Sequence, residues 1–128
     1  METSTTNDIK VSVQTFYLVR ESRPKMQHYA HAYRITIENM GSEKVQLLRR
    51  HWYIWDSNNS LREVEGEGVV GEQPTLAPGE SFEYTSWCPL STEVGKMYGT
   101  FLMQRAKDRS EFKVDVPEFK LIAPGKSN

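Results

Sequence analysis

The sequence predicts an all-β protein built as a sandwich or a barrel, and three observations lead to this fold class. Short segments alternate apolar and polar residues, with the period of two that is typical of a half-buried strand. Turns that contain glycine, proline or asparagine separate these segments. No stretch of about ten or more residues carries the apolar stripe of an amphipathic helix.

The predicted strands follow one another along most of the chain. The first begins with Ile9, Val11 and Val13, which alternate with polar residues. The longest spans residues 44–56 and is rich in aromatic and β-branched side chains. Pro117 interrupts the last apolar stretch and divides it into two strands. The predicted strands cover residues 9–19, 29–39, 44–56, 61–65, 81–86, 97–104, 111–116 and 119–123.

The chain length of 128 residues suits one domain. Residues 1–8 are polar, and we predict that they form a flexible N-terminal tail. Residues 9–124 form the single predicted domain, and residues 125–128 are a C-terminal tail.

The charge and the single cysteine exclude several classes of protein. The net charge of −1 gives no strong field toward nucleic acid or an anionic membrane, so neither is predicted as a partner. One cysteine, Cys88, excludes a disulfide scaffold. The first residues lack the features of a signal peptide. No apolar run approaches the ~20 residues of a membrane span, so we expect a cytoplasmic location.

Gly66, Gly68 and Gly71 have the GxGxxG spacing of dinucleotide-binding loops. That fingerprint needs a helix directly after the glycines, because the N–H groups at its N-terminus bind the pyrophosphate. Here a proline-glycine turn at residues 76–80 leaves no room for a helix. We therefore interpret the glycines as bends or bulges between strands, with anion binding by backbone N–H groups as the alternative.

The charges near this loop oppose anion binding unless basic groups come from elsewhere. Arg49 and His51 share one face of the longest predicted strand, and Arg50 lies on the other face. These three are the candidate supporting charges. The acidic residues around the loop are Glu63, Glu65, Glu67 and Glu72.

No catalytic residues, cofactor site or metal site are predicted. His28 and His31 are three residues apart, which places them on opposite faces if both are extended. Glu65 and Glu67 share a face and offer oxygen ligands to a hard cation, so divalent-cation sensing is a further alternative. Cys88 has no nearby histidine or helix N-terminus to lower the pKa of its thiol.

The aromatic residues of the longest strand divide between its two faces. Trp52 and Ile54 point one way, and Trp52 is the candidate core tryptophan of an immunoglobulin-like sandwich. Tyr53 and Trp55 point the other way. They are either exposed contact anchors for a protein partner or buried under an adjacent loop.

Several long motifs occur in an order similar to that of bacterial ApaG proteins. They are "VQLLRRHWYIWDSN", "EVEGEGVVGEQPTLAPGESFEYTS", "CPL" and "GKMYGTFLM". The similarity runs from about Tyr29 to Pro124, so the chain resembles the ApaG family. The resemblance implies an immunoglobulin/fibronectin type III-like β-sandwich of about seven to eight antiparallel strands. It also implies a cytoplasmic protein without an established enzymatic activity.

The same resemblance implies several functional associations. The family is associated with cobalt and magnesium tolerance, and with genes for diadenosine tetraphosphate hydrolysis and ribosomal RNA methylation. Similar domains in eukaryotic F-box proteins imply a recognition role. The glycine motif of the family has been suggested to bind pyrophosphate or nucleotide, which carries onto Gly66, Gly68 and Gly71. Family members usually read "TSGCPL", and Trp87 stands where that glycine would be. If the glycine has a positive φ or lies against a ligand, Trp87 obstructs it, so this departure weakens a ligand site there.

We therefore expect a non-enzymatic protein-binding module, monomeric or weakly homodimeric, that uses no cofactor. The first alternative is binding of a small anion or nucleotide at the glycine loop. The second is divalent-cation sensing.

Overall fold

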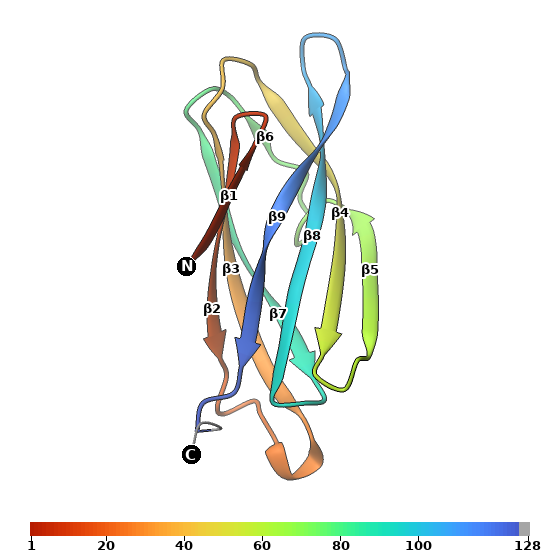
Figure 1. Cartoon of the computed structure of the whole chain (residues 1–128). Helices are drawn as coiled ribbons and strands as arrows, with labels where there is room; N and C mark the ends of the chain where they lie inside the picture. Colours follow the sequence, from red (N-terminus) through yellow and green to blue (C-terminus); the bar gives the residue numbers. More distant parts are fainter. Residues whose placement is uncertain (126–128) are drawn as a thin grey trace.

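The computed structural model describes residues 1–125 and places them in two antiparallel β-sheets that pack face to face (Figure 1). This arrangement confirms the predicted all-β sandwich. The smaller sheet has the strand order β1-β2-β3-β7. Its strands are β1 (Glu2–Thr6), β2 (Ile9–Tyr17), β3 (Tyr29–Asn39) and β7 (Ser81–Leu90).

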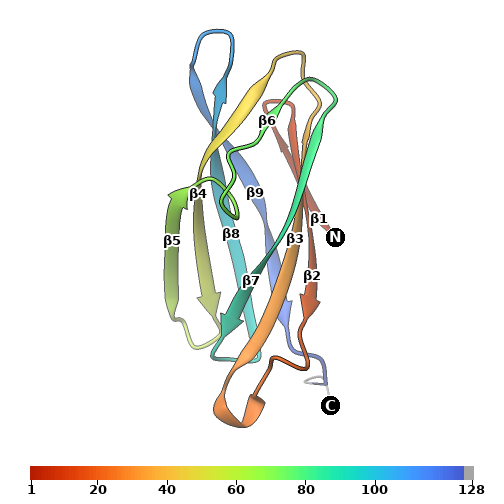
Figure 2. The same cartoon turned by 180° about the vertical axis from the view of Figure 1, so that it is seen from behind.

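The larger sheet has the order β5-β4-β8-β9, and the short strand β6 pairs with the beginning of β4 (Figure 2). Within residues 1–125 the only helix is the short 3-10 turn η1 (Pro24–Met26), between β2 and β3. The strands of the larger sheet are β4 (Val45–Asp56), β5 (Leu61–Glu67), β6 (Thr75–Leu76), β8 (Val94–Arg105) and β9 (Glu111–Ile122).

The prediction of a flexible tail at residues 1–8 is wrong, because β1 pairs with β2 from Thr6 opposite Ile9 to Glu2 opposite Val13. Asn7 and Asp8 make the turn with positive φ angles of 48° and 64°. Two successive residues with positive φ form the tight hairpin whose twist matches antiparallel strands. β1 is polar throughout, so no apolar alternation marks it in the sequence.

The two strands predicted around Pro117 are one strand, β9. Opposite Tyr98 the pairing of β8 with β9 shifts register, between Met97 and Gly99, which is the signature of a β-bulge. Because β9 is the edge strand of the larger sheet, the missing N–H of Pro117 does not interrupt a central ladder.

Trp52 lies in the core, as predicted, with 3% of its surface exposed. Its ring meets Phe101 and Phe119 edge-to-face, with centroids 6.2 Å and 5.9 Å away. Phe101 lies on β8 and Phe119 on β9, so three neighbouring strands of the larger sheet share this aromatic cluster. Tyr33 of β3 joins it from the smaller sheet, 5.4 Å from Trp52.

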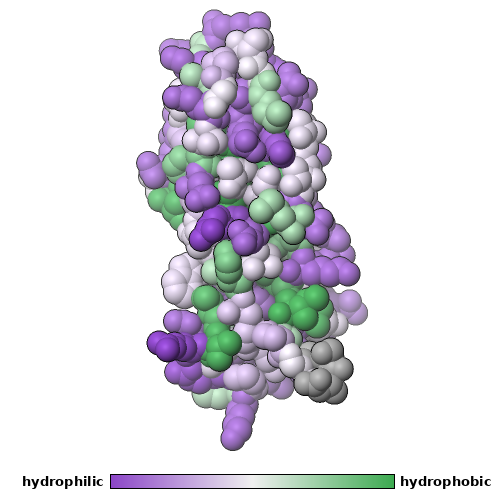
Figure 3. Space-filling model, turned by 90° about the vertical axis from the view of Figure 1, so that its left-hand side faces the viewer, coloured by the Kyte–Doolittle hydropathy of each residue, from purple (hydrophilic) through white to green (hydrophobic). Residues whose placement is uncertain are grey.

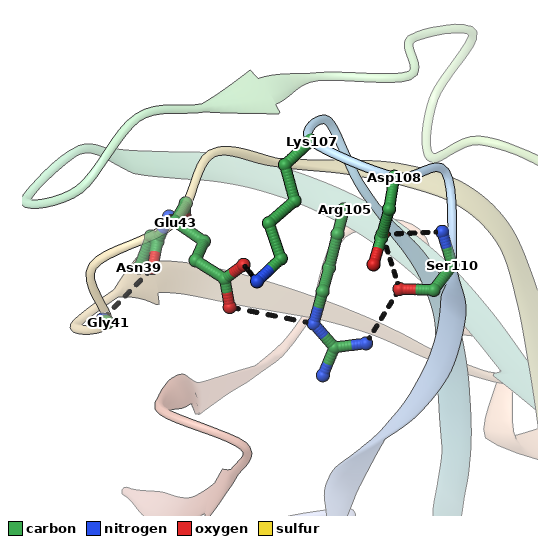
Figure 4. Close-up of polar contacts among 7 residues, drawn as sticks. All are labelled: Asn39, Gly41, Glu43, Arg105, Lys107, Asp108 and Ser110. Atoms are coloured by element: carbon green, nitrogen blue, oxygen red, sulfur yellow. Dashed lines mark hydrogen bonds and ion pairs between the residues drawn. The ribbon is translucent and has the colours of Figure 1, made fainter.

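A polar network ties the β8–β9 hairpin to the end of the β3–β4 turn (Figure 4). The Glu43 carboxylate forms ion pairs with the Lys107 ammonium at 2.7 Å and with the Arg105 guanidinium at 3.7 Å. Ser110 donates both its N–H and its hydroxyl to Asp108, at 2.9 Å and 2.7 Å. The hydrogen bond to Glu43 raises the pKa of Lys107, and the bonds from Ser110 lower the pKa of Asp108. These contacts position the hairpin at the surface.

His31 makes the stability of the fold depend on pH. The ring is 2% exposed, lies edge-to-face on Tyr17 at 5.2 Å, and burial lowers its pKa from 6.5 to about 4. The unfolded chain therefore binds a proton that the native chain excludes, and native stability is lost as pH falls from about 6.5 towards 4. Between pH 7 and pH 5 we expect urea unfolding to show a loss of about 2 kcal/mol from this group. His31→Phe, which keeps an aromatic ring but cannot titrate, should lack this contribution; an equal loss in that variant would contradict it.

Candidate functional site

The glycine loop (residues 66–72) closes on itself in a tight turn. Val69 and Glu72 form an isolated antiparallel bridge, with N–H to carbonyl distances of 2.8 Å and 2.9 Å. Val70 and Gly71 between them have positive φ angles of 41° and 81°. Val69 is fully buried and fixes the turn to the core. The loop is therefore a small hairpin anchored by its own valine.

The loop uses several of its backbone donors internally. The Gly68 N–H donates to the Leu48 carbonyl at 2.8 Å, and the Val69 and Glu72 N–H groups serve the turn itself. Gly68 has a φ of +63°, and a Cβ there would lie 2.3 Å from the Glu72 carbonyl oxygen. Glycine is thus required at position 68 by both the backbone angle and the close approach.

Arg50 reaches the loop, but it meets carbonyl oxygens. Its guanidinium Nη1 donates to the carbonyls of Glu67 at 3.0 Å and Gly68 at 3.1 Å. A Cβ on Gly66 would lie 3.1 Å from that same nitrogen, so this glycine makes room for the arginine. The loop presents carbonyls to a cation here, which is the reverse of what anion binding requires.

Arg49 and His51 lie on the outer face of β4, away from the smaller sheet. His51 Nε2 is 2.9 Å from the Glu63 carboxylate, and its Nδ1 is 3.8 Å from Glu65. The three predicted basic residues line a hollow of about 90 Å³ together with Glu65, Thr100 and Leu102. Lys113 of β9 also lines it, and sequence reasoning missed this residue because β9 reaches β4 only through β8.

Tyr53 and Trp55 belong to an aromatic ladder on the outer face of the larger sheet: His51, Tyr53, Trp55 and Tyr98. His51 stacks on Tyr53 at 4.5 Å and Tyr53 stacks on Tyr98 at 5.2 Å, with interplanar angles of 17° and 18°. The Trp55 indole N–H donates to the Tyr98 hydroxyl at 3.0 Å. All four side chains are half-buried. They pack against one another on the outer face of the sheet and remain partly exposed there.

Tyr98 was missed at the level of sequence, although one signal was available. The alternation of β8 places Met97, Phe101 and Met103 in the core, and Tyr98 therefore on the outside. Its contact with Tyr53 depends on the pairing of β4 with β8, which is not visible in a single sequence.

Trp87 lies in the regular strand β7, opposite Ala32 of β3. Its side chain is on the outer face of the smaller sheet and is 64% exposed. Its φ is not among the positive values of the described residues, so the larger side chain is accommodated without backbone strain.

Within residues 1–125, neither the Cys88 thiol nor a cluster of acidic side chains is arranged as a nucleophile or a metal site. Cys88 is 2% exposed, and burial raises the pKa of its thiol to about 11 although the Arg62 guanidinium is 3.8 Å away. Over residues 1–125, no group of three or more histidine, cysteine or acidic side chains is arranged to hold a metal ion. The same part of the chain contains no helix long and apolar enough to cross a membrane.

Comparison with known proteins places the chain in a family. The family model of the ApaG domain matches residues 19–105. The chain belongs to the ApaG family. It is 50% identical over 124 residues to protein ApaG of Paramagnetospirillum magneticum, which covers 97% of this chain and 95% of that relative. Protein ApaG of Acidithiobacillus ferrooxidans is 49% identical over 124 residues, with 96% of both chains covered.

A solved structure supports the ApaG fold of this chain. The crystal structure of a Bordetella pertussis protein described as ApaA superposes with a TM-score of 0.88 at 46% identity. The match covers 92% of this chain and 95% of that one. The two-sheet sandwich is therefore the ApaG fold, and the aromatic ladder and the glycine loop are features of this chain within it.

Proposed function

We propose that this ApaG-family chain is a non-catalytic protein-binding module, and that its contact surface is the outer face of the larger sheet. The aromatic ladder is the observation that carries the proposal. Tyrosine and tryptophan are enriched among the residues that contribute most to protein interfaces. Here they stand together on the outer face of the larger sheet, with the exposed Leu61 paired opposite Trp55.

The ladder is preorganised for binding. Stacking of Tyr53 between His51 and Tyr98, and the bond from Trp55 to Tyr98, restrict the side-chain rotamers before any partner arrives. An interface built on fixed side chains loses less conformational entropy on association. Because the rings stack on one another, they offer their edges and hydroxyl groups to a partner, which favours a protein over stacked bases.

Charged residues border the ladder on both sides. Glu63 and Glu65 lie along β5, and Lys96 lies opposite Trp55 on β8. Arg49 and Lys113 lie beyond His51 at the small hollow. An aromatic centre with a charged rim is the common anatomy of a specific protein interface.

Two titratable groups outside the ladder, the Cys88 thiol and the His31 ring, support a non-catalytic role. The Cys88 thiol is buried with a raised pKa, so it is a poor nucleophile near neutral pH. The His31 ring is buried and neutral, so it cannot reach a substrate in solvent.

The test is affinity capture from an extract of the source cells with the tagged chain. A chain carrying Tyr53→Ser and Trp55→Ser should bind the captured protein about thirtyfold more weakly or worse, because truncating such anchors reduces the binding free energy by about 2 kcal/mol or more. Trp87→Ser is the matched control, since it removes an exposed tryptophan from the other sheet. Equal capture by the double variant, with its fold verified by circular dichroism, would contradict the proposal.

A second candidate function is small-anion binding, favoured by the basic side chains of Arg49, His51 and Lys113 at the hollow, which Glu65 also lines. Calorimetry with pyrophosphate should then show saturable heat, and charge reversal by Arg49→Glu with Lys113→Glu should remove it. Arg20→Glu with Lys25→Glu is the matched control, since it reverses two exposed charges that do not line the hollow. Absence of heat at millimolar pyrophosphate would end this candidate.

A further inference from the structure

We infer that the open edge of β2, residues 14–17, is a docking position for one extended segment of a partner protein, which continues the line of β1. The segment runs antiparallel to β2, as β1 does, and places one apolar side chain in the cavity between β2 and β9. This edge is distinct from the aromatic ladder, so the inference does not rest on the function proposed for that face.

β1 covers only part of the edge of β2. Its pairing ends with Glu2 opposite Val13, whereas β2 continues to Tyr17 and pairs with β3 over its whole length. Over residues 14–17, β2 therefore has a strand partner on one side only within the described part of the chain. Figure 1 shows the start of β1 beside the middle of β2.

The register identifies which backbone groups face the open edge. Just past the end of β2, the Leu18 N–H donates to the Ala30 carbonyl of β3 at 2.9 Å. Backbone groups alternate sides along a strand, so the even-numbered residues of β2 direct their N–H and C=O groups at β3. Thr15 and Tyr17 direct theirs at the open edge, where they can pair with another strand.

A cavity of about 460 Å³ adjoins this edge. Val13 of β2 and Phe119 of β9 belong to its lining, and both are buried. Thr15 points inward by alternation with Val13, yet its side chain is exposed, because the cavity leaves it uncovered. The inward side chains of an added strand would enter this cavity.

β1 shows how a strand at the edge of β2 can bond to both sheets. The Ser4 hydroxyl donates to the Asp115 carbonyl at 3.0 Å, and the Asp115 N–H donates to the Thr6 hydroxyl at 3.2 Å. β1 thereby pairs with β2 and also bonds to the edge of β9, which closes the seam between the two sheets. A segment that continues β1 past Glu2 would extend this closure over the cavity.

The charges at the cavity define the chemistry of the segment. Glu118 pairs with Lys96 at 3.5 Å. Glu2, Lys120 and Met1 with its N-terminal ammonium also line the cavity, and within residues 1–125 none of them forms an ion pair, so one negative and two positive groups remain. A charged inward side chain of either sign would meet at least one repulsive neighbour, so an uncharged apolar one is complementary. Hydrophilic groups are interspersed with apolar patches on this side of the molecule (Figure 3), and the outward side chains of the segment face solvent, so polar ones suit these positions.

The test is a selection from a phage-displayed library of random dodecapeptides on the immobilised full chain, followed by binding measurements with the synthetic peptides. We expect selected peptides to alternate apolar and polar residues, and Thr15→Pro to weaken their binding about tenfold through loss of one outward N–H donor. Thr15→Val is the matched control, because it keeps that donor.

Two controls show whether a loss of peptide binding comes from the β2 edge, from unfolding or from the aromatic ladder. Thr15→Pro removes no β2–β3 hydrogen bond, so its melting temperature should stay close to that of the native chain. Tyr53→Ser should leave the peptide affinity unchanged, which separates this result from a failure of the ladder. Selection of no peptide, or equal binding of the peptides to Thr15→Pro, would overturn the inference. So would a native homodimer that Thr15→Pro dissociates, since a second copy would then be the occupant.

Discussion

Replacing Gly68 by alanine is expected to destabilise the native state by roughly 2–4 kcal/mol, which is more than we expect for the same substitution at Gly71. The positive φ of +63° disfavours any L side chain, and the new Cβ would lie 2.3 Å from the Glu72 carbonyl oxygen. That oxygen accepts the Val69 N–H, so relief of the clash opens the turn. Equilibrium unfolding in urea measures the loss.

Gly71→Ala is the matched control for this substitution. Its φ is +81°, but a Cβ there meets no atom within 4 Å, so only the backbone penalty of roughly 1–2 kcal/mol applies. Equal losses at the two positions would show that the close approach at Gly68 is relieved without cost. A stable Gly68→Ala chain that had lost a ligand would instead favour a binding role for the loop.

Trp52→Ala is expected to reduce the free energy of unfolding by about 3–5 kcal/mol, because it leaves a cavity where three strands of the larger sheet meet. Trp52 packs against Phe101 and Phe119 across this sheet and against Tyr33 of the other. Trp87→Ala removes a residue of the same type from an exposed position, and there we expect a change within about 0.5 kcal/mol. Urea unfolding of both variants at pH 7 provides the comparison.

A loss above about 2 kcal/mol in Trp87→Ala would contradict the placement of this side chain on the outer face. It would show that the indole covers apolar surface on Ala32 and its neighbours more completely than its exposure indicates. A small loss in Trp52→Ala would contradict the aromatic core.

Most strands were predictable because local alternation reports burial. β8 buries alternate residues over most of its length, and β3 does so from Tyr33 onward, where the sequence shows this pattern directly. β1 was not predictable in this way. Its hydroxyl side chains are held by the backbone of Asp115, which is more than a hundred residues away in the chain. Contacts between residues so far apart in the chain produce no local alternation of apolar and polar residues.

The candidate site was predictable in its residues but not in its geometry. Strand alternation correctly separates Arg49 and His51 from Arg50. It could not show that Arg50 would bond to carbonyls of the glycine loop, because that contact depends on the pairing of β4 with β5. Tyr98 and Lys113 join the outer face through the pairings of β4 with β8 and of β8 with β9.

The glycine loop and the aromatic ladder are linked by β4. One face of this strand carries Arg50, which supports the loop, and the other carries His51, Tyr53 and Trp55. The loop therefore helps to hold the strand that presents the ladder. The glycines therefore support the proposed binding surface indirectly, because their backbone geometry shapes the loop that Arg50 of β4 contacts.

The most direct test of the account is site-specific photo-crosslinking in the source cells with benzoylphenylalanine at Thr100 or at Thr85. Thr100 lies on the outer face of the larger sheet, opposite His51, and Thr85 lies on β7, two residues from Trp87 on the other sheet. The account predicts a covalent adduct with one defined protein at position 100 and none at position 85. An adduct at position 85 alone, or at neither position, would contradict the claim that the ladder face binds a protein.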